Sequence, residues 1–165
     1  MNRVAIFIGK IFFFIAAIIF FMFGIQSCKK KYVTPVITAT LNGSYAFSAD
    51  VTATYAYGQI RLIATQTGSP IKDIEIDVTA ASTGTYSLNS ANGINTGLYI
   101  EGPNTSNLIK YETDASHTGS VTFTKMDLTK QLMSGTFSYN ALEFSPTVGT
   151  ASVVITNGSF TNVPW

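Results

Sequence analysis

The chain has 165 residues, enough for one globular domain and a short extension. Its ten basic and nine acidic side chains give a net charge of +1, and beyond Lys31 five basic residues face nine acidic ones. That part of the chain has no basic stripe, which argues against nucleic-acid binding because phosphate neutralisation needs clustered Lys and Arg.

The N-terminus has the layout of an export signal. Arg3 and Lys10 precede a run of fifteen predominantly apolar residues from Ile11 to Ile25. A membrane-spanning helix needs about 20 such residues, whereas the apolar run of a signal peptide has about 7–15. The pattern predicts a hydrophobic signal helix in residues 1–27 that is removed on export. An uncleaved anchor that begins at Val4 is the alternative.

The only cysteine, Cys28, follows this run. The stretch GIQSC at 24–28 resembles the lipobox of bacterial lipoproteins, although Gln26 stands where that pattern has a small or aliphatic residue. The resemblance implies cleavage between Ser27 and Cys28, a diacylglyceryl group on the Cys28 sulfur, and acylation of the new amine. It also accounts for a single cysteine in an exported chain, where cysteines usually come in even numbers. An ordinary cleaved signal followed by an accidental cysteine is the alternative.

Residues 28–35 are expected to form the lipidated N-terminus and a short tether. Two or three acyl chains anchor a protein durably, since each buried methylene contributes about 0.8 kcal/mol. Lys29, Lys30 and Lys31 would contact the membrane surface, where each base adds about 1 kcal/mol on anionic headgroups. The N-terminus therefore predicts a membrane as the partner of this protein, bound through its lipid.

Residues 36–165 are rich in Thr, Ser, Asn, Gly, Tyr, Val and Ile, which favour strands and turns. Apolar and polar residues alternate in several runs, as where Ile74, Ile76 and Val78 are interleaved with acidic residues. Such alternation is typical of antiparallel sheets with one wet face. We therefore predict an all-β fold, an antiparallel β-sandwich or a partly open barrel, without sustained helical periodicity.

The turn signals divide this domain into short strands. Asn42-Gly43, Asn92-Gly93 and Asn157-Gly158 are strong turn dipeptides. Residues 127–133 could hold a helical turn or a wide loop. Strands are predicted at residues 36–41, 44–55, 59–66, 71–79, 84–88, 97–101, 108–113, 119–126, 134–142, 150–156 and 159–162.

The domain also resembles an uncharacterised family of small β-rich lipoproteins from Bacteroidota. The matching stretches are ATLNGSYAF at 39–47, GSVTFTKMD at 119–127, SGTFSY at 134–139 and ITNGSF at 155–160. These motifs are structural, and the resemblance carries no catalytic residues. In that phylum, acidic residues after the lipidated cysteine mark export to the cell surface. Lysines stand there in this chain, which implies an outer-membrane protein that faces the periplasm.

Few residues of the domain are candidates for chemistry. His117, the only histidine, lies in an expected turn after Asp114, without the elbow or metal motifs that would make it catalytic. Asp73, Glu75 and Asp77 share one strand face and could be calcium ligands, but a solvated sheet face is the simpler interpretation. Asp127 is expected to cap a turn. Tyr55, Tyr57, Tyr99, Tyr111 and Trp165 could form an aromatic platform or could be half-buried strand residues.

The sequence thus predicts an envelope lipoprotein whose domain binds a partner or has a structural role. No enzyme activity, cofactor or metal is predicted, and a protein or glycan partner is left open. One alternative is a carrier that holds a small ligand in an apolar barrel interior. Another is a hydrolase that uses His117 and nearby acids.

Overall fold

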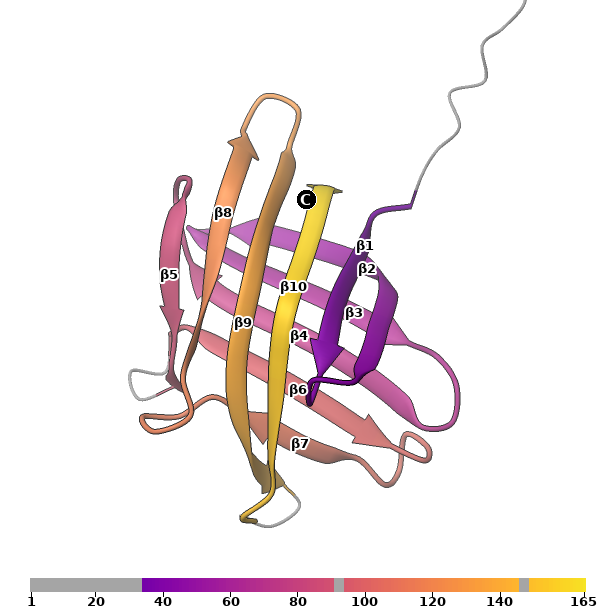
Figure 1. Cartoon of the computed structure of the whole chain (residues 1–165). Helices are drawn as coiled ribbons and strands as arrows, with labels where there is room; N and C mark the ends of the chain where they lie inside the picture. The colour runs from indigo at the N-terminus through magenta and orange to yellow at the C-terminus, as the bar shows by residue number, and fades with distance from the viewer. Residues whose placement is uncertain (1–33, 91–93, 146–148) are drawn as a thin grey trace, which may run out of the picture. The chain divides into compact units, whose positions relative to one another are not determined.

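The computed structural model describes residues 34–90, 94–145 and 149–165 (Figure 1). The predicted signal helix, the cleavage site at Ser27 and Cys28, the three lysines that follow and the Asn92-Gly93 turn all lie outside these residues. Within them, no helix is long and apolar enough to cross a membrane.

The domain consists of ten antiparallel strands, which confirms the predicted all-β fold. The strands are β1 (Val36–Leu41), β2 (Tyr45–Ala56), β3 (Gln59–Gln66), β4 (Ile71–Thr79), β5 (Gly84–Leu88), β6 (Thr96–Gly102), β7 (Ile109–Glu112), β8 (Gly119–Asp127), β9 (Leu132–Ser145) and β10 (Ser152–Pro164).

The strands form a single sheet in the order β10-β1-β2-β3-β4-β6-β7-β9-β8-β5, and β10 also pairs with β9. This extra pairing closes the sheet on itself, as in a barrel. β9 makes the closure possible because it is long: its residues 132–139 pair with β8, and its residues 142–145 pair with β7. Figure 1 shows β8, β9 and β10 crossing in front of β2, β3, β4 and β6 at a steep angle.

Alternation along each strand directs one set of side chains into this closed sheet. On β4, Ile74, Ile76 and Val78 are at most 1% exposed, as the sequence pattern predicts. The interior is filled by large side chains from both layers. Those that are under 2% exposed include Phe47, Phe123 and Phe160. The core is therefore built from the protein's own aromatic and aliphatic groups.

The aromatic rings of β8, β9 and β10, the strands of the front layer in Figure 1, pack closely because glycines leave room for them. The rings of Phe123 and Phe160 lie 5.8 Å apart, edge to face. A Cβ atom at Gly135, on β9, would lie 2.6 Å from Cζ of Phe160 and 2.3 Å from the carbonyl oxygen of Thr122. Only glycine fits this position without a shift of β8 or of the Phe160 ring.

One predicted turn is wrong. Asn157-Gly158 does not end a strand, because β10 runs continuously through it and pairs with β1 on one side and β9 on the other. The register shifts between Ile155 and Gly158, and Asn157 has a φ of 52°. The dipeptide thus forms a β-bulge, which the two flanking strands hold in place.

The turn between β2 and β3 has an unexpected residue. Tyr57 and Gly58 form it, with φ values of 54° and 78°, and Tyr57 is fully exposed rather than half-buried. Residues 128–131 form a turn that joins β8 to β9, which resolves the open prediction for this stretch.

All ten strands and their pairings lie within residues 34–165, which form one compact unit. The segment therefore contains every contact that closes its own sheet.

Candidate functional site

A cavity of about 210 Å³ lies at one open end of the closed sheet. We call it the mouth pocket. The inward faces of the strands become polar where they reach this end: Lys72 continues the row of Ile74 and Ile76 on β4, and Glu101 continues the row of Tyr99 on β6. The side chains that line it include Leu41, Tyr45, Lys72, Tyr99, Glu101, Tyr111 and Val153.

Two opposite charges face the mouth pocket. Lys72 and Glu101 are direct partners in the register of β4 and β6. Lys72 is only 9% exposed, and its Nζ lies 4.7 Å from the centre of the Tyr45 ring, a cation–π contact. Glu101 accepts a hydrogen bond of 2.9 Å from the Tyr99 hydroxyl through its Oε2. The two charges are not among the ion pairs that the described residues form.

Tyrosine rings make up much of the wall of the pocket. Tyr99 and Tyr111 are buried, with ring centres 5.8 Å apart. Burial raises the pKa of both hydroxyls, and the nearby Glu101 carboxylate raises each pKa further. Both hydroxyls therefore stay protonated at neutral pH and act as hydrogen-bond donors.

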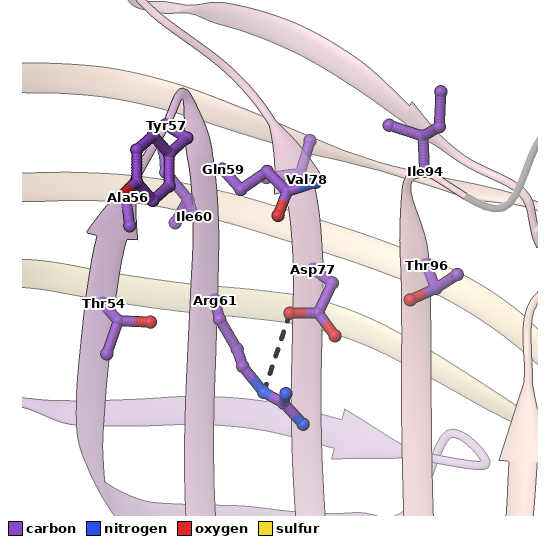
Figure 2. A pocket seen from close by; sticks show the side chains of 10 residues that line it. All are labelled: Thr54, Ala56, Tyr57, Gln59, Ile60, Arg61, Asp77, Val78, Ile94 and Thr96. Carbon is purple, nitrogen blue, oxygen red and sulfur yellow. Dashed lines mark ion pairs between the residues drawn. The ribbon is translucent and has the colours of Figure 1, made fainter.

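A second hollow, of about 390 Å³, lies on the outer face of β2, β3, β4 and β6 (Figure 2). Thr54, Arg61, Asp77 and Thr96 cross it in one row, because each is the register partner of the next. Arg61 forms an ion pair with Asp77 at 3.7 Å and another with Glu75. The hollow is open, and the two charged side chains in its lining, Arg61 and Asp77, already pair with each other.

The three acids of β4 do share one face, but Glu75 is not solvated as expected. Its side chain is 11% exposed, because Ile63 and Leu98 flank it on the neighbouring strands and Arg61 covers it. Burial raises the pKa of Glu75, and the Arg61 guanidinium opposes this rise. In the part of the chain that the structure describes, no group of three or more His, Cys, Asp or Glu side chains is placed to hold a metal ion.

The outer face of β5, β8, β9, β10 and β1 carries a row of hydroxyl groups. Register partners line up in one row across five strands: Thr85, Thr122, Thr136, Ser159 and Thr38. The end pairs are hydrogen-bonded, at 2.8 Å between Thr85 and Thr122 and 2.9 Å between Thr38 and Ser159. A shallow hollow of about 510 Å³ lies over the middle of this row, at Thr122, Thr136 and Ser159. Its lining residues carry no charge and include Phe137 beside the hydroxyl groups.

His117 and Asp114 form a structural turn. The Asp114 Oδ1 accepts hydrogen bonds of 2.6 Å from the backbone N–H groups of Ser116 and His117, and it lies 3.1 Å from the His117 Nδ1. The same amides lower the pKa of Asp114. Asp127 acts in a similar way, since its Oδ1 accepts from the N–H groups of Thr129 and Lys130, as predicted for a turn cap.

The predicted aromatic platform is divided in the structure. Tyr99 and Tyr111 line the mouth pocket, whereas Tyr55 packs edge to face on Trp165 at 5.8 Å, and Tyr57 stands alone on its turn. Sequence reasoning missed Lys72 and Glu101. The available signal was a charged residue at an inward position of an alternating strand, two residues from a buried Ile or Tyr.

A model of the family described as "Domain of unknown function (DUF6252)" matches residues 33–164, and the chain therefore belongs to this family. No curated protein and no solved structure matches the chain.

Proposed function

We propose that this member of the DUF6252 family is a lipid-anchored protein of the bacterial cell envelope whose β-domain acts by binding rather than by catalysis. The observation that carries the binding role is the mouth pocket, where the side chains of Lys72, Glu101, Tyr99 and Tyr111 line one cavity. Pockets with a few convergent polar groups on a rigid scaffold are typical binding sites, and the mouths of closed sheets are among their usual places.

The anchor is supported by the division of the chain. The family match begins at residue 33, so the apolar run, Cys28 and the three lysines all precede the matched domain. An exported chain with its single cysteine at the end of a signal-like run fits a lipidation site better than a structural thiol. Lysines in place of acids after Cys28 support an outer-membrane location that faces the periplasm.

The non-catalytic role is supported by the contacts of the candidate reactive groups. Asp114 and His117 fix a turn, Asp127 caps another, and Glu75 and Asp77 are paired with Arg61. The carrier alternative has less support than a site at the open end, because large buried side chains fill the interior.

The anchor is tested by fractionation of cells that produce the full chain. The wild type should be found in the membrane fraction as the cleaved chain. Cys28→Ser cannot receive the lipid, so it should either leave the membrane fraction or remain there as the longer precursor that still carries residues 1–27. Ser27→Ala is the matched control, because it keeps a small residue before the cysteine and should behave as the wild type. A Cys28→Ser variant that is processed and membrane-bound like the wild type would contradict the proposal.

A further inference from the structure

We propose that the mouth pocket binds a free α-amino acid, with the ligand carboxylate at Lys72 and the ligand ammonium at Glu101. This inference names the ligand class for the binding role proposed above and rests on that role.

Lys72 supplies the argument for an anionic group. An ammonium has three N–H donors, and burial of such a charge is costly unless acceptors or an opposite charge compensate it. The contact of the Lys72 ammonium seen in the structure is with the face of the Tyr45 ring, which accepts no conventional hydrogen bond. A ligand carboxylate in the cavity that Lys72 lines would supply both an opposite charge and hydrogen-bond acceptors.

Glu101 supplies the argument for a cationic group on the same ligand. Paired positions on neighbouring strands bring Cβ atoms to about 5 Å, so Lys72 and Glu101 start close together. Their charged ends nevertheless have different partners: Glu101 takes a hydrogen bond from Tyr99, and Lys72 packs on Tyr45. The cavity thus presents a positive and a negative group that do not pair with each other. An α-amino acid can contact both, because its carboxylate and its ammonium are bonded to the same carbon atom.

The size and walls of the pocket suit a single small molecule. Its volume of about 210 Å³ corresponds to about seven waters and is below the roughly 300–1,000 Å³ of drug-sized sites. The rings of Tyr45, Tyr99 and Tyr111, with Leu41 and Val153, offer an apolar wall for a side chain. One amino acid fits these limits better than a polymer segment.

The test titrates residues 33–165, which hold all the strand pairings, with L-leucine and follows amide chemical shifts by NMR. Two matched probes each lack one charge: 4-methylpentanoate has no amine, and 3-methylbutylamine has no carboxylate. Leucine should saturate the domain and bind at least about tenfold more tightly than either probe, since each lost charged contact costs that much or more. The shifted amides should lie around the mouth pocket.

Lys72→Met and Glu101→Gln should each weaken leucine binding by about tenfold or more. Lys110→Met is the matched control, because Lys110 lies on the outer face of β7, and leucine should bind it as the wild type does. If Lys72→Met does not fold, Lys72→Arg and Glu101→Gln carry the test, with Lys72→Arg retaining binding. Absence of saturable leucine binding, or equal binding of the one-charge probes, would overturn the inference.

The outcome separates this inference from the proposed anchor. Residues 33–165 lack Cys28, so failure of the anchor would leave this titration unchanged. Failure of the titration would remove the amino-acid ligand and leave the membrane fractionation as it is.

Discussion

Individual residues of this domain depart from the simple alternation of polar and apolar faces, and each departure has a physical cause. Glu75 lies on the outward face of β4 and yet is buried, because Ile63 and Leu98 stand beside it and Arg61 pairs with it. Lys72 lies on the inward face and yet is charged, because the strand has reached the open end of the sheet. Alternation in the sequence identifies the sheet face on which each side chain lies. It does not show whether residues on neighbouring strands will bury that side chain or pair with its charge.

The burial of Glu75 predicts a specific pH dependence. Its pKa is raised chiefly by burial, so the folded protein holds a proton that the unfolded chain releases over the same pH range. The contribution of this group to stability is therefore present at low pH and is lost as the pH rises through the raised pKa. In Glu75→Gln that loss is absent, so the free energy of unfolding of the variant should improve relative to the wild type as the pH rises from about 4 to about 7.

Urea denaturation across this pH range measures the difference. Asp50→Asn, at an exposed position on β2, serves as the control for removal of one negative charge. A constant difference between wild type and Glu75→Gln at all pH values would show that the carboxyl of Glu75 is not perturbed in the folded protein.

Most of the strands were predictable from the sequence, because alternation of apolar and polar residues indicates a strand and turn residues mark its ends. The ranges 36–41, 59–66, 71–79 and 84–88 agree with β1, β3, β4 and β5. The failures concern local signals that distant strands override. Asn157-Gly158 favours a hairpin by itself, but pairing with both β1 and β9 holds it in one strand as a bulge. Tyr57, a candidate for a half-buried position, is instead fully exposed in the turn that it forms with Gly58.

The contact between the front strands predicts that Gly135 is essential for stability. In Gly135→Ala, the new Cβ would meet the Thr122 carbonyl and the Phe160 ring, and neither has room to move without displacing β8 or the core. The free energy of unfolding should fall by about 3 kcal/mol. Thermal and chemical denaturation of the purified domain measure this loss.

Gly43→Ala is the matched comparison, because Gly43 has open space around its Cα and bears only the strain of a φ of 72°. Its cost should be about 1 kcal/mol. Equal losses in the two variants would mean that the packing of Phe160 against β9 does not limit stability.

At the scale of the whole molecule, closure of the sheet was beyond the reach of sequence reasoning. The pairs that span long separations in the chain join β1 to β10 and β7 to β9, whereas β9 and β10, whose pairing closes the sheet, are consecutive strands. The mouth pocket depends on that closure, since it collects residues from β1, β2, β4, β6, β7 and β10. For this reason the sequence could not show which of its tyrosines line one cavity, and Lys72 and Glu101 were missed.

The division of the chain into an anchor and a binding domain is the central claim, and the mass of the mature N-terminus tests it most directly. Mass spectrometry of the protein extracted from membranes should find a chain that begins at Cys28 and carries acyl groups on its sulfur and amine. A wild-type chain that retains residues 1–27, or one that begins elsewhere with a free Cys28 thiol, would contradict the account.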